Sequence, residues 1–268
     1  MIQLQPLKMI AALSLSLLIS ACQTSGKTNE DEQALLNGKL QIARNSLDQG
    51  RPAEALGELR QLIREYPQNP TVQTLMGFTQ LALGNKGKAL GFLRKAFQLS
   101  PTVANGLNLS AAYIENRQYK RAIRLLGKLA KQAPKYEYPE RIYHNLGYVS
   151  EKMKDTRKSL VFYKKALEEN PTFYPAKLQL AKAYQKLGRK NLALQAYREA
   201  MDYCHVCYEP VESLARGYIQ NGQLRHARDL LLRYGKIRGV AKTDMNKARK
   251  LLRMVSAMKQ KASRTARR

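Results

Sequence analysis

The segment Glu140–Pro171, ERIYHNLGYVSEKMKDTRKSLVFYKKALEENP, contains two amphipathic patterns separated by a polar break at residues 154–156. Apolar and small residues recur three or four positions apart in each half, which predicts two helices that each bury one face. Pro171 follows the second pattern directly and cannot continue that helix. Gly147 on the first helix and Ser159 on the second are small enough to let the two helices cross closely. The segment therefore predicts one helix–turn–helix unit.

The same unit recurs along most of the chain. The counterparts of Gly147 follow one another at steps of 34, 33, 37, 34 and 34 residues, and two columns on the second helix keep the same steps. The three columns are Ala43, Gly77, Ser110, Gly147, Ala181 and Ala215; Ala55, Ala89, Ala122, Ser159, Ala193 and Ala227; and Leu59, Leu93, Leu126, Tyr163, Tyr197 and Leu231. Their shared register predicts six repeats, at 36–69, 70–102, 103–136, 140–173, 174–207 and 208–241.

Units of this length and pattern resemble tetratricopeptide repeats. The resemblance implies an all-α fold, a right-handed superhelical solenoid of six helix pairs. After residue 241 a further apolar pattern recurs at helical spacing, from Met245 through Val255 to Met258. This pattern predicts a C-terminal helix that caps the open end of the stack, as terminal units of a solenoid must.

The first 21 residues have the composition of a secretory signal, in which Lys8 precedes a short apolar run and small residues follow. The run is too short to cross a membrane. Residues 18–22, LISAC, resemble a bacterial lipobox, which implies cleavage before Cys22 and lipidation of its thiol. An ordinary signal peptide with an incidental cysteine is the alternative. Gln23 after the cysteine implies sorting to the outer membrane, so the expected location is its periplasmic face.

These features predict four regions in the chain. Residues 1–21 form the lipoprotein signal peptide, and residues 22–35 hold the lipidated cysteine and a flexible, polar tether. Residues 36–241 form the six repeats, and residues 242–268 form a basic capping helix and tail.

The formal net charge of +27 at pH 7 indicates anionic surroundings. Residues 236–268 contain twelve Lys and Arg residues and one Asp, so we expect a basic surface there that contacts anionic lipid or peptidoglycan. The residues chosen for that surface are Lys247, Arg249, Lys250 and Arg253. Nucleic acid is a second class of anionic partner, but the sequence has no clustered aromatic platform for stacking bases. Together with the expected location, this predicts no nucleic-acid partner.

Motifs for catalysis are not found in the sequence. H-E-x-x-H, G-x-S-x-G, the P-loop and G-x-G-x-x-G are all absent, so we expect no enzyme, no cofactor and no metal. His144 lies on the first helix of the fourth repeat. We interpret it as a solvated surface residue, with contact to a bound ligand as the alternative.

The segment Cys204-His205-Val206-Cys207 is the most reactive cluster in the sequence. An oxidising compartment favours a disulfide between Cys204 and Cys207 that fixes the turn between repeats five and six. A reduced pair, or a redox or metal role, is the alternative. A second Cys/His pair for zinc is missing, and Tyr208 stands where haem attachment requires histidine.

The first helices of tetratricopeptide repeats line the inner face of the solenoid. Over repeats one to three that face is expected to form a partner-binding groove, comprising Leu40, Arg44, Leu47, Thr74, Phe78, Leu81, Leu107, Ala111 and Ile114. An apolar groove of this kind suits an amphipathic helix or a short apolar segment. The alternative is that several of these side chains are half buried between helices.

Residues 138–141, Tyr-Pro-Glu-Arg, precede Asn145-Leu146-Gly147 and then Val149-Ser150. With this string and the lipobox, the chain resembles the outer-membrane lipoprotein pilotins of type IV pili, the PilF, PilW and Tgl group, from the signal peptide to about residue 235. The resemblance implies a non-enzymatic protein that helps the pilus secretin, a ring-forming channel, to reach the outer membrane and assemble there. A scaffold for another envelope-biogenesis or peptidoglycan complex is the alternative, because it would share every feature except the string.

The lipobox predicts that Cys22 is the acylated N-terminal residue of the mature protein. Mass spectrometry of the purified protein should show a lipid-modified peptide that begins at Cys22. A Cys22→Ser variant should lose its membrane attachment, because acyl chains supply the stable anchor. If that variant stays on membranes after mild washing, the anchor is elsewhere.

Overall fold

The computed structural model describes residues 29–265, and Cys22, the lipobox and the first part of the predicted tether lie outside the described residues. Within that range the chain forms thirteen α-helices and one short 3₁₀ helix. The elements are α1 Asn29–Asp48, α2 Pro52–Glu65, α3 Pro70–Ala82, α4 Lys86–Leu99, α5 Val103–Glu115, α6 Tyr119–Ala130, η1 Ala133–Lys135, α7 Pro139–Lys152, α8 Thr156–Glu169, α9 Tyr174–Lys186, α10 Lys190–Tyr203, α11 Tyr208–Gln220, α12 Leu224–Tyr234 and α13 Lys242–Thr265.

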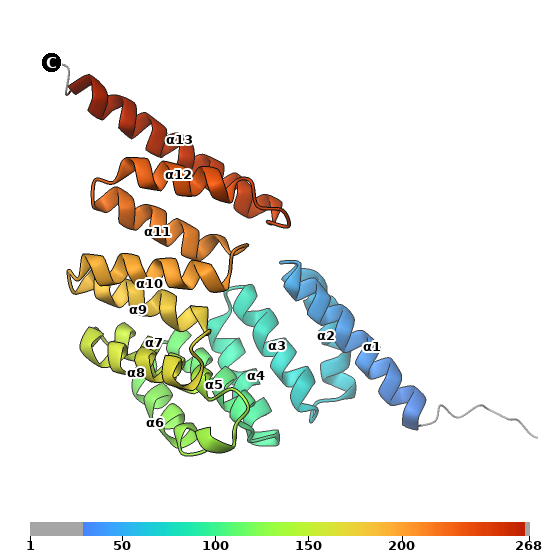
Figure 1. Ribbon diagram of the computed structural model, residues 1–268. Helices are drawn as coiled ribbons and strands as arrows, with labels where there is room; N and C mark the ends of the chain where they lie inside the picture. Colours follow the sequence, from blue (N-terminus) through green and yellow to red (C-terminus); the bar gives the residue numbers. More distant parts are fainter. Residues whose placement is uncertain (1–28, 266–268) are drawn as a thin grey trace, which may run out of the picture.

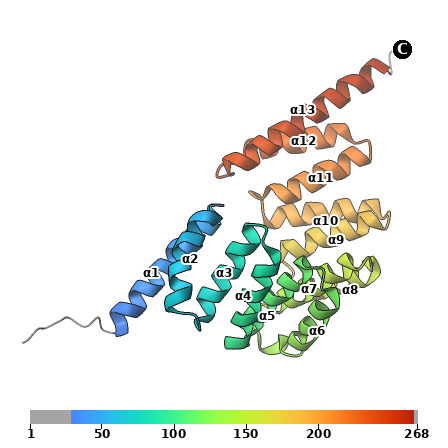
Figure 2. The ribbon, with the colours of Figure 1, turned by 180° about the vertical axis from the view of Figure 1, so that it is seen from behind.

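The first twelve α-helices form six successive helix pairs, each packed against the next (Figures 1 and 2). Each predicted repeat contains one of these pairs, from α1 and α2 to α11 and α12. Contacts run within a pair and between neighbouring pairs, which is the arrangement of a solenoid. The predicted all-α solenoid of six helix pairs with a C-terminal helix is confirmed.

Helix α1 begins earlier than the sequence analysis placed it. It starts at Asn29, so residues 29–35, assigned above to the flexible tether, are helical. Glu30, Asp31 and Glu32 occupy its first turn, where negative charge interacts favourably with the helix dipole. Glu32 also accepts a hydrogen bond from the hydroxyl of Tyr66 at 2.8 Å. This contact ties the first turn to the end of α2, thirty-four residues away, which the local polar composition did not indicate.

The three repeated columns form the centre of each helix pair. All their residues are buried; Ala43, Ala181 and Ala215, for example, are 0% exposed, and Tyr163 and Leu59 are likewise 0% exposed. A Cβ atom built on Gly147 would lie 2.5 Å from the Tyr163 ring, and one on Gly77 would lie 2.5 Å from Leu93. The small residue of the first helix therefore makes room for the large residue of the second.

The turn inside each pair uses one residue with left-handed backbone geometry. Four of the six positions are glycine: Gly50, Gly84, Gly188 and Gly222 have φ angles of 71°, 79°, 72° and 73°. Repeats three and four place Arg117 (φ 57°) and Lys154 (φ 66°) at the same position. Non-glycine residues adopt this geometry less readily. The tight turn is therefore imposed by the packing of the two helices it connects.

The stack has an inner and an outer surface. Several first helices contact each other directly, as α1 does with α3, α5 with α7 and α7 with α9. Within residues 29–265, no two successive second helices pack together to that extent. The second helices thus splay apart on the outer side, which curves the stack toward its first helices.

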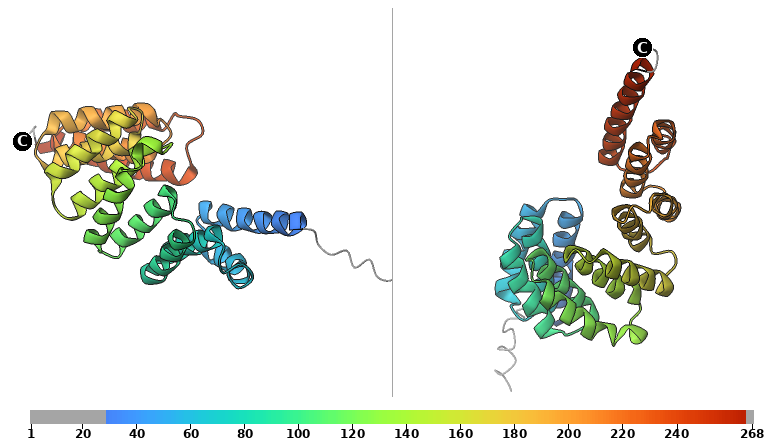
Figure 3. Two further views of the ribbon diagram at one scale, coloured as in Figure 1. Left: turned by 90° about the horizontal axis from the view of Figure 1, so that it is seen from below. Right: turned by 90° about the vertical axis from the view of Figure 1, so that its left-hand side faces the viewer.

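Helix α13 closes the C-terminal end. Ala248, Leu251 and Val255 are buried against Leu230 and Leu231 of α12 in one apolar cluster. The helix lies along α12 and continues past its end (Figures 1 and 3). The predicted capping face is thus used as far as Val255, whereas Met258 is exposed.

The contact between Gly147 and Tyr163 predicts a pair of opposite stability changes. Gly147→Ala forces a methyl group against the ring and should lower the free energy of unfolding by about 1–3 kcal/mol. Gly127→Ala is the matched control, because Gly127 lies in α6 with no atom near its Cβ position. It should raise stability by about 0.5–1 kcal/mol through helix propensity. Urea unfolding followed by circular dichroism measures both, and equal effects would contradict the packing role.

Candidate functional site

An open groove lies on the inner surface, between the first helices of repeats one and two. It encloses about 520 Å³ and is lined by Arg44, Leu47 and Asp48 from α1 and by Thr71, Thr74, Leu75, Phe78 and Ala82 from α3. Phe78 of α3 is 37% exposed, and Leu47 of α1 is half buried on the facing side of the groove. The groove therefore presents an aromatic ring and an aliphatic side chain to a partner.

Four of the nine residues predicted for the groove line it: Arg44, Leu47, Thr74 and Phe78. The sequence analysis did not select Asp48, Thr71, Leu75 or Ala82. Thr71, Leu75 and Ala82 recur three or four positions from Thr74 and Phe78. Extending that face of α3 by one turn each way would therefore have found Thr71 and Ala82, and Leu75 lies between them on the same face.

The prediction was wrong for Leu40, Leu107 and Ile114. They are 8%, 8% and 5% exposed, and all three belong to apolar clusters of the core. Leu81 is half buried against the cluster that contains Leu90 and Leu93. The half-buried alternative thus applies to these positions, because first helices in adjacent repeats close over them.

Ala111 is exposed, but it does not line the groove. The groove in the structure is therefore shorter than predicted and is confined to repeats one and two.

The groove carries both signs of charge. Arg44 and Asp48 lie one turn apart on α1, so a cation and a carboxylate stand at its rim. On the α3 side of the groove the Thr74 hydroxyl donates a hydrogen bond to the Asn105 side-chain oxygen at 3.4 Å, which links α3 to α5. Such polar groups around an apolar centre can orient a bound segment while Leu47 and Phe78 supply the buried contact.

The pilotin-like string of repeat four is mostly core. Leu146 and Val149 are 5% and 0% exposed, and Ser150 donates its hydroxyl to the Leu146 carbonyl at 2.7 Å. The exposed part is the start of α7, where the Arg141 guanidinium stacks 4.6 Å over the Tyr138 ring. Most of the string therefore serves the packing of repeat four, and none of its residues line the groove.

The His144 side chain is half-buried between helices rather than solvated, which corrects the interpretation above. Its ring packs against those of Tyr163 and Phe173, with centroids 5.8 and 5.6 Å away. Its Nε2 atom is buried without a hydrogen-bond partner among the described residues. Burial lowers the pKa of His144 below its ordinary value, while a hydrogen bond with Asn145 and the charge of Glu151 act in the opposite direction. The neutral imidazole is thus the form that the fold accommodates.

Cys204 and Cys207 are joined by a disulfide, with Cα atoms 5.3 Å apart. The bridged turn connects α10 to α11. It is also fastened to the next helix, because the Tyr234 hydroxyl donates to the Val206 carbonyl at 2.8 Å. The disulfide thus closes a largely exposed turn between repeats five and six that a hydrogen bond fastens to α12.

The predicted basic surface lies on the open side of α13. Lys247, Arg249, Lys250 and Arg253 are all exposed. Lys247 pairs with Asp244 at 2.9 Å. No group of three His, Cys, Asp or Glu side chains within the described part of the chain could hold a metal ion. Nor does any helix in that part have the length and hydropathy to cross a membrane.

Parts of the chain match known tetratricopeptide repeats. Tetratricopeptide-repeat family models match residues 46–102, 140–173 and 174–204. Such solenoids act through protein–protein contacts on their surfaces. This places the inner groove among the surfaces where a protein partner would bind.

Its fold is similar to that of type IV pilus biogenesis proteins. The crystal structure of PilW, a widely conserved type IV pilus biogenesis factor, matches with a TM-score of 0.62 and 16% identity over 79% of this chain and 96% of that one. PilF of Pseudomonas aeruginosa matches with a TM-score of 0.59 and 18% identity over 79% and 95%. At these identities the likeness establishes the fold.

Two other matches are proteins that are not described as pilus proteins. The Cut9–Hcn1 hetero-tetramer of the APC/C contains a chain with a TM-score of 0.59 and 17% identity, of which 42% is covered, over 81% of this chain. The uncharacterized protein ycf37 of Cyanophora paradoxa is 27% identical over 125 residues, which is 46% of this chain and 69% of that protein. The fold alone therefore does not select one partner.

The burial of His144 predicts a pH-dependent stability. Because its folded pKa lies below the unfolded value of about 6.5, the unfolded state binds the proton more readily, and stability falls as the pH drops below about 6.5. His144→Gln should reduce this fall in urea unfolding between pH 8 and pH 5. Ile42→Gln, at an exposed position that does not titrate, is the control and should leave the fall unchanged. An unaltered pH profile in His144→Gln would contradict the neutral, buried state.

Proposed function

We propose that this protein is an outer-membrane-anchored scaffold that binds a pilus secretin and promotes its localisation and multimer assembly in type IV pilus biogenesis. The observation that carries the proposal is the open apolar groove of repeats one and two, with Phe78 exposed beside Leu47. In this proposal the groove holds a short apolar segment of the secretin. The proposal gives the protein a binding role without catalysis.

Three features support the pilus setting together. The fold is similar to PilW and PilF over most of their lengths. The string from Tyr138 to Ser150 and the lipobox at residues 18–22 resemble the pilotin lipoproteins. Each feature is weak alone, since fold and repeats are shared with unrelated scaffolds. Their coincidence in one chain favours a pilotin over a scaffold for another envelope-biogenesis or peptidoglycan complex.

In this proposal the lipid anchor keeps the groove close to the outer membrane. Acyl chains on Cys22 would hold the protein on the periplasmic face of the outer membrane. Only residues 23–28 separate Cys22 from α1, and six residues span at most ~20 Å. The groove residues of α1, Arg44, Leu47 and Asp48, lie a further ~22–28 Å along that helix from Asn29. A secretin segment bound there would be held within ~50 Å of the membrane in which the channel assembles.

The exposed cations of α13 fit the same location. Arg249, Lys250 and Arg253 face solvent on the side of the helix opposite its buried residues Ala248, Leu251 and Val255. An exposed basic face attracts anionic lipid or peptidoglycan, and the attraction weakens with salt. In the proposal this contact supplements the lipid anchor.

The groove predicts which substitutions abolish secretin binding. Burying one large apolar side chain contributes about 1.5–3 kcal/mol, so Phe78→Glu or Leu47→Glu should weaken binding at least roughly tenfold. Ile42→Glu is the matched control: Ile42 is an apolar residue of α1, 53% exposed, that does not line the groove. It should leave affinity within about twofold. Co-purification of secretin with the membrane-bound protein, and titration of the purified pair, measure these changes.

Cells test the proposal independently of the variants. A strain without this protein should contain secretin as monomer or in the wrong membrane. If secretin multimers form normally in its outer membrane, the pilotin role fails, and the scaffold for another envelope complex takes its place.

A further inference from the structure

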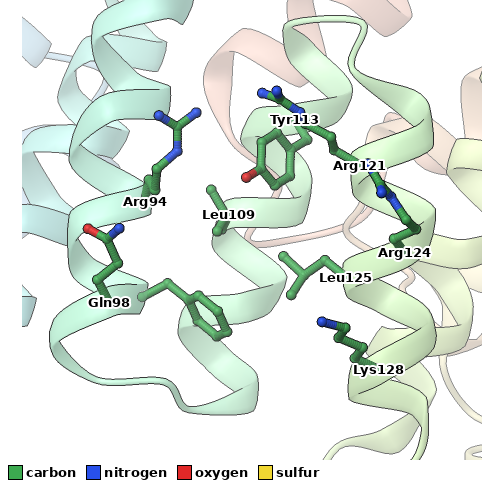
Figure 4. Close-up of a pocket in the computed structure, with 9 residues that line it drawn as sticks. Arg94, Gln98, Leu109, Tyr113, Arg121, Arg124, Leu125 and Lys128 are labelled. Atoms are coloured by element: carbon green, nitrogen blue, oxygen red, sulfur yellow. The ribbon is translucent and has the colours of Figure 1, made fainter.

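A second hollow lies on the outer surface, away from the inner groove. It is bounded by the second helices α4 and α6, with α5 beneath them (Figure 4), and encloses about 450 Å³. Its lining comprises Arg94, Phe97 and Gln98 from α4, Leu109 and Tyr113 from α5, and Arg121, Arg124, Leu125 and Lys128 from α6. Figure 4 shows Arg94 on one wall facing Arg121, Arg124 and Lys128 on the other, with Leu109 and Tyr113 between them.

The curvature of the solenoid creates this hollow. Because α4 and α6 splay apart on the outer side, the space between them is not filled by their own side chains. Its floor is one face of the core cluster around Leu90, Leu93 and Leu109, on which Phe97, Tyr113 and Leu125 lie partly exposed. The apolar floor is therefore rigid and already formed.

The cations around the hollow are not neutralised. Arg94, Arg124 and Lys128 are exposed, and no ion pair is formed by these or by Arg121 within residues 29–265. No carboxylate lines the hollow.

Residues 86–135 contain eleven Lys and Arg residues and a single acidic residue, Glu115. That carboxylate is already paired with Lys86 at 2.8 Å. The hollow therefore lies in a part of the chain with a large excess of positive charge. The run of basic residues is visible in the sequence, which the sequence analysis did not separate from the overall charge.

We propose that this outer hollow binds an acidic peptide segment with an apolar side chain at its centre. The cations of α6 stand at positions 121, 124 and 128, so they are spread over ~10 Å of one helix face, and Arg94 is on the opposite wall. One phosphate or one headgroup cannot reach all four. Several carboxylates along a peptide can, and guanidinium groups bind carboxylates through paired hydrogen bonds. The apolar floor takes the central side chain.

This site is separate from the inner groove. It uses α4, α5 and α6 instead of α1 and α3, and no residue lines both. A protein with both surfaces could hold two partners, an apolar segment inside and an acidic segment outside. Loss of one binding activity would leave the other unchanged.

The test uses the full-length protein in detergent and a fluorescein-labelled peptide of sequence EDEFLDED, followed by fluorescence anisotropy at low salt. The double variant Arg94→Gln/Arg124→Gln removes one exposed cation from each wall and should weaken binding at least roughly tenfold, since hydrogen bonds to charged groups are strong. The matched control, Arg249→Gln/Lys250→Gln on α13, removes the same charge elsewhere and should change affinity less than about threefold. The peptide EDEGGDED, without the apolar pair, should bind the unaltered protein at least roughly tenfold more weakly.

Three outcomes would overturn the proposal. Equal binding of EDEFLDED and EDEGGDED would mean that the floor is not used. Equal loss in both double variants would mean that the protein attracts acidic peptides through its net charge. Phosphatidylglycerol vesicles or a thymidine oligonucleotide binding more tightly than EDEFLDED, through Arg94 and Arg124, would assign the hollow to another class of ligand.

Discussion

The close approach of the two helices in each repeat is the contact on which the structure depends. In repeat four, Gly147 leaves no room for even one methyl group before the ring of Tyr163. The equivalent positions in the other repeats are Ala, Gly or Ser opposite Leu or Tyr, and all are buried. Since each repeat satisfies this constraint within itself and then packs on its neighbours, six weak units form one continuous core.

The same constraint generates both candidate binding surfaces. Tight pairing fixes the angle between a first and a second helix, and repeated stacking brings first helices together while second helices splay. On the inner side this leaves the groove between α1 and α3, and on the outer side the hollow between α4 and α6. The two surfaces differ in chemistry because the side chains that line them take no part in the pairing. Phe78 can therefore face a partner inside while Arg124 does so outside.

The residues that make the chain look like a pilotin and those that could bind a partner are largely different residues. Leu146, Gly147 and Val149 of the distinctive string are buried in repeat four, so they specify how that repeat packs. Phe78 and Leu47 lie two and three repeats away, in columns that vary from repeat to repeat. The counterparts of Phe78, for example, include Arg44, Ala111 and Lys182. The likeness to PilW and PilF, at 16% and 18% identity, is a likeness of fold. The partner must therefore be tested at the groove itself.

The sequence by itself determined the repeats, their helix pairs, the capping helix and part of the groove. Periodic small and large residues encode local helix pairing, and local pairing can be counted along a chain. Four groove residues followed from the resemblance to tetratricopeptide repeats, whose first helices line the inner face. Only the tertiary structure decided that Leu40, Leu107 and Ile114 are core, that His144 is enclosed by Tyr163 and Phe173, and that residues 29–35 continue α1. Each of these three findings depends on side chains from a neighbouring helix or repeat. The apolar period of one helix does not indicate which residues of another helix will cover it.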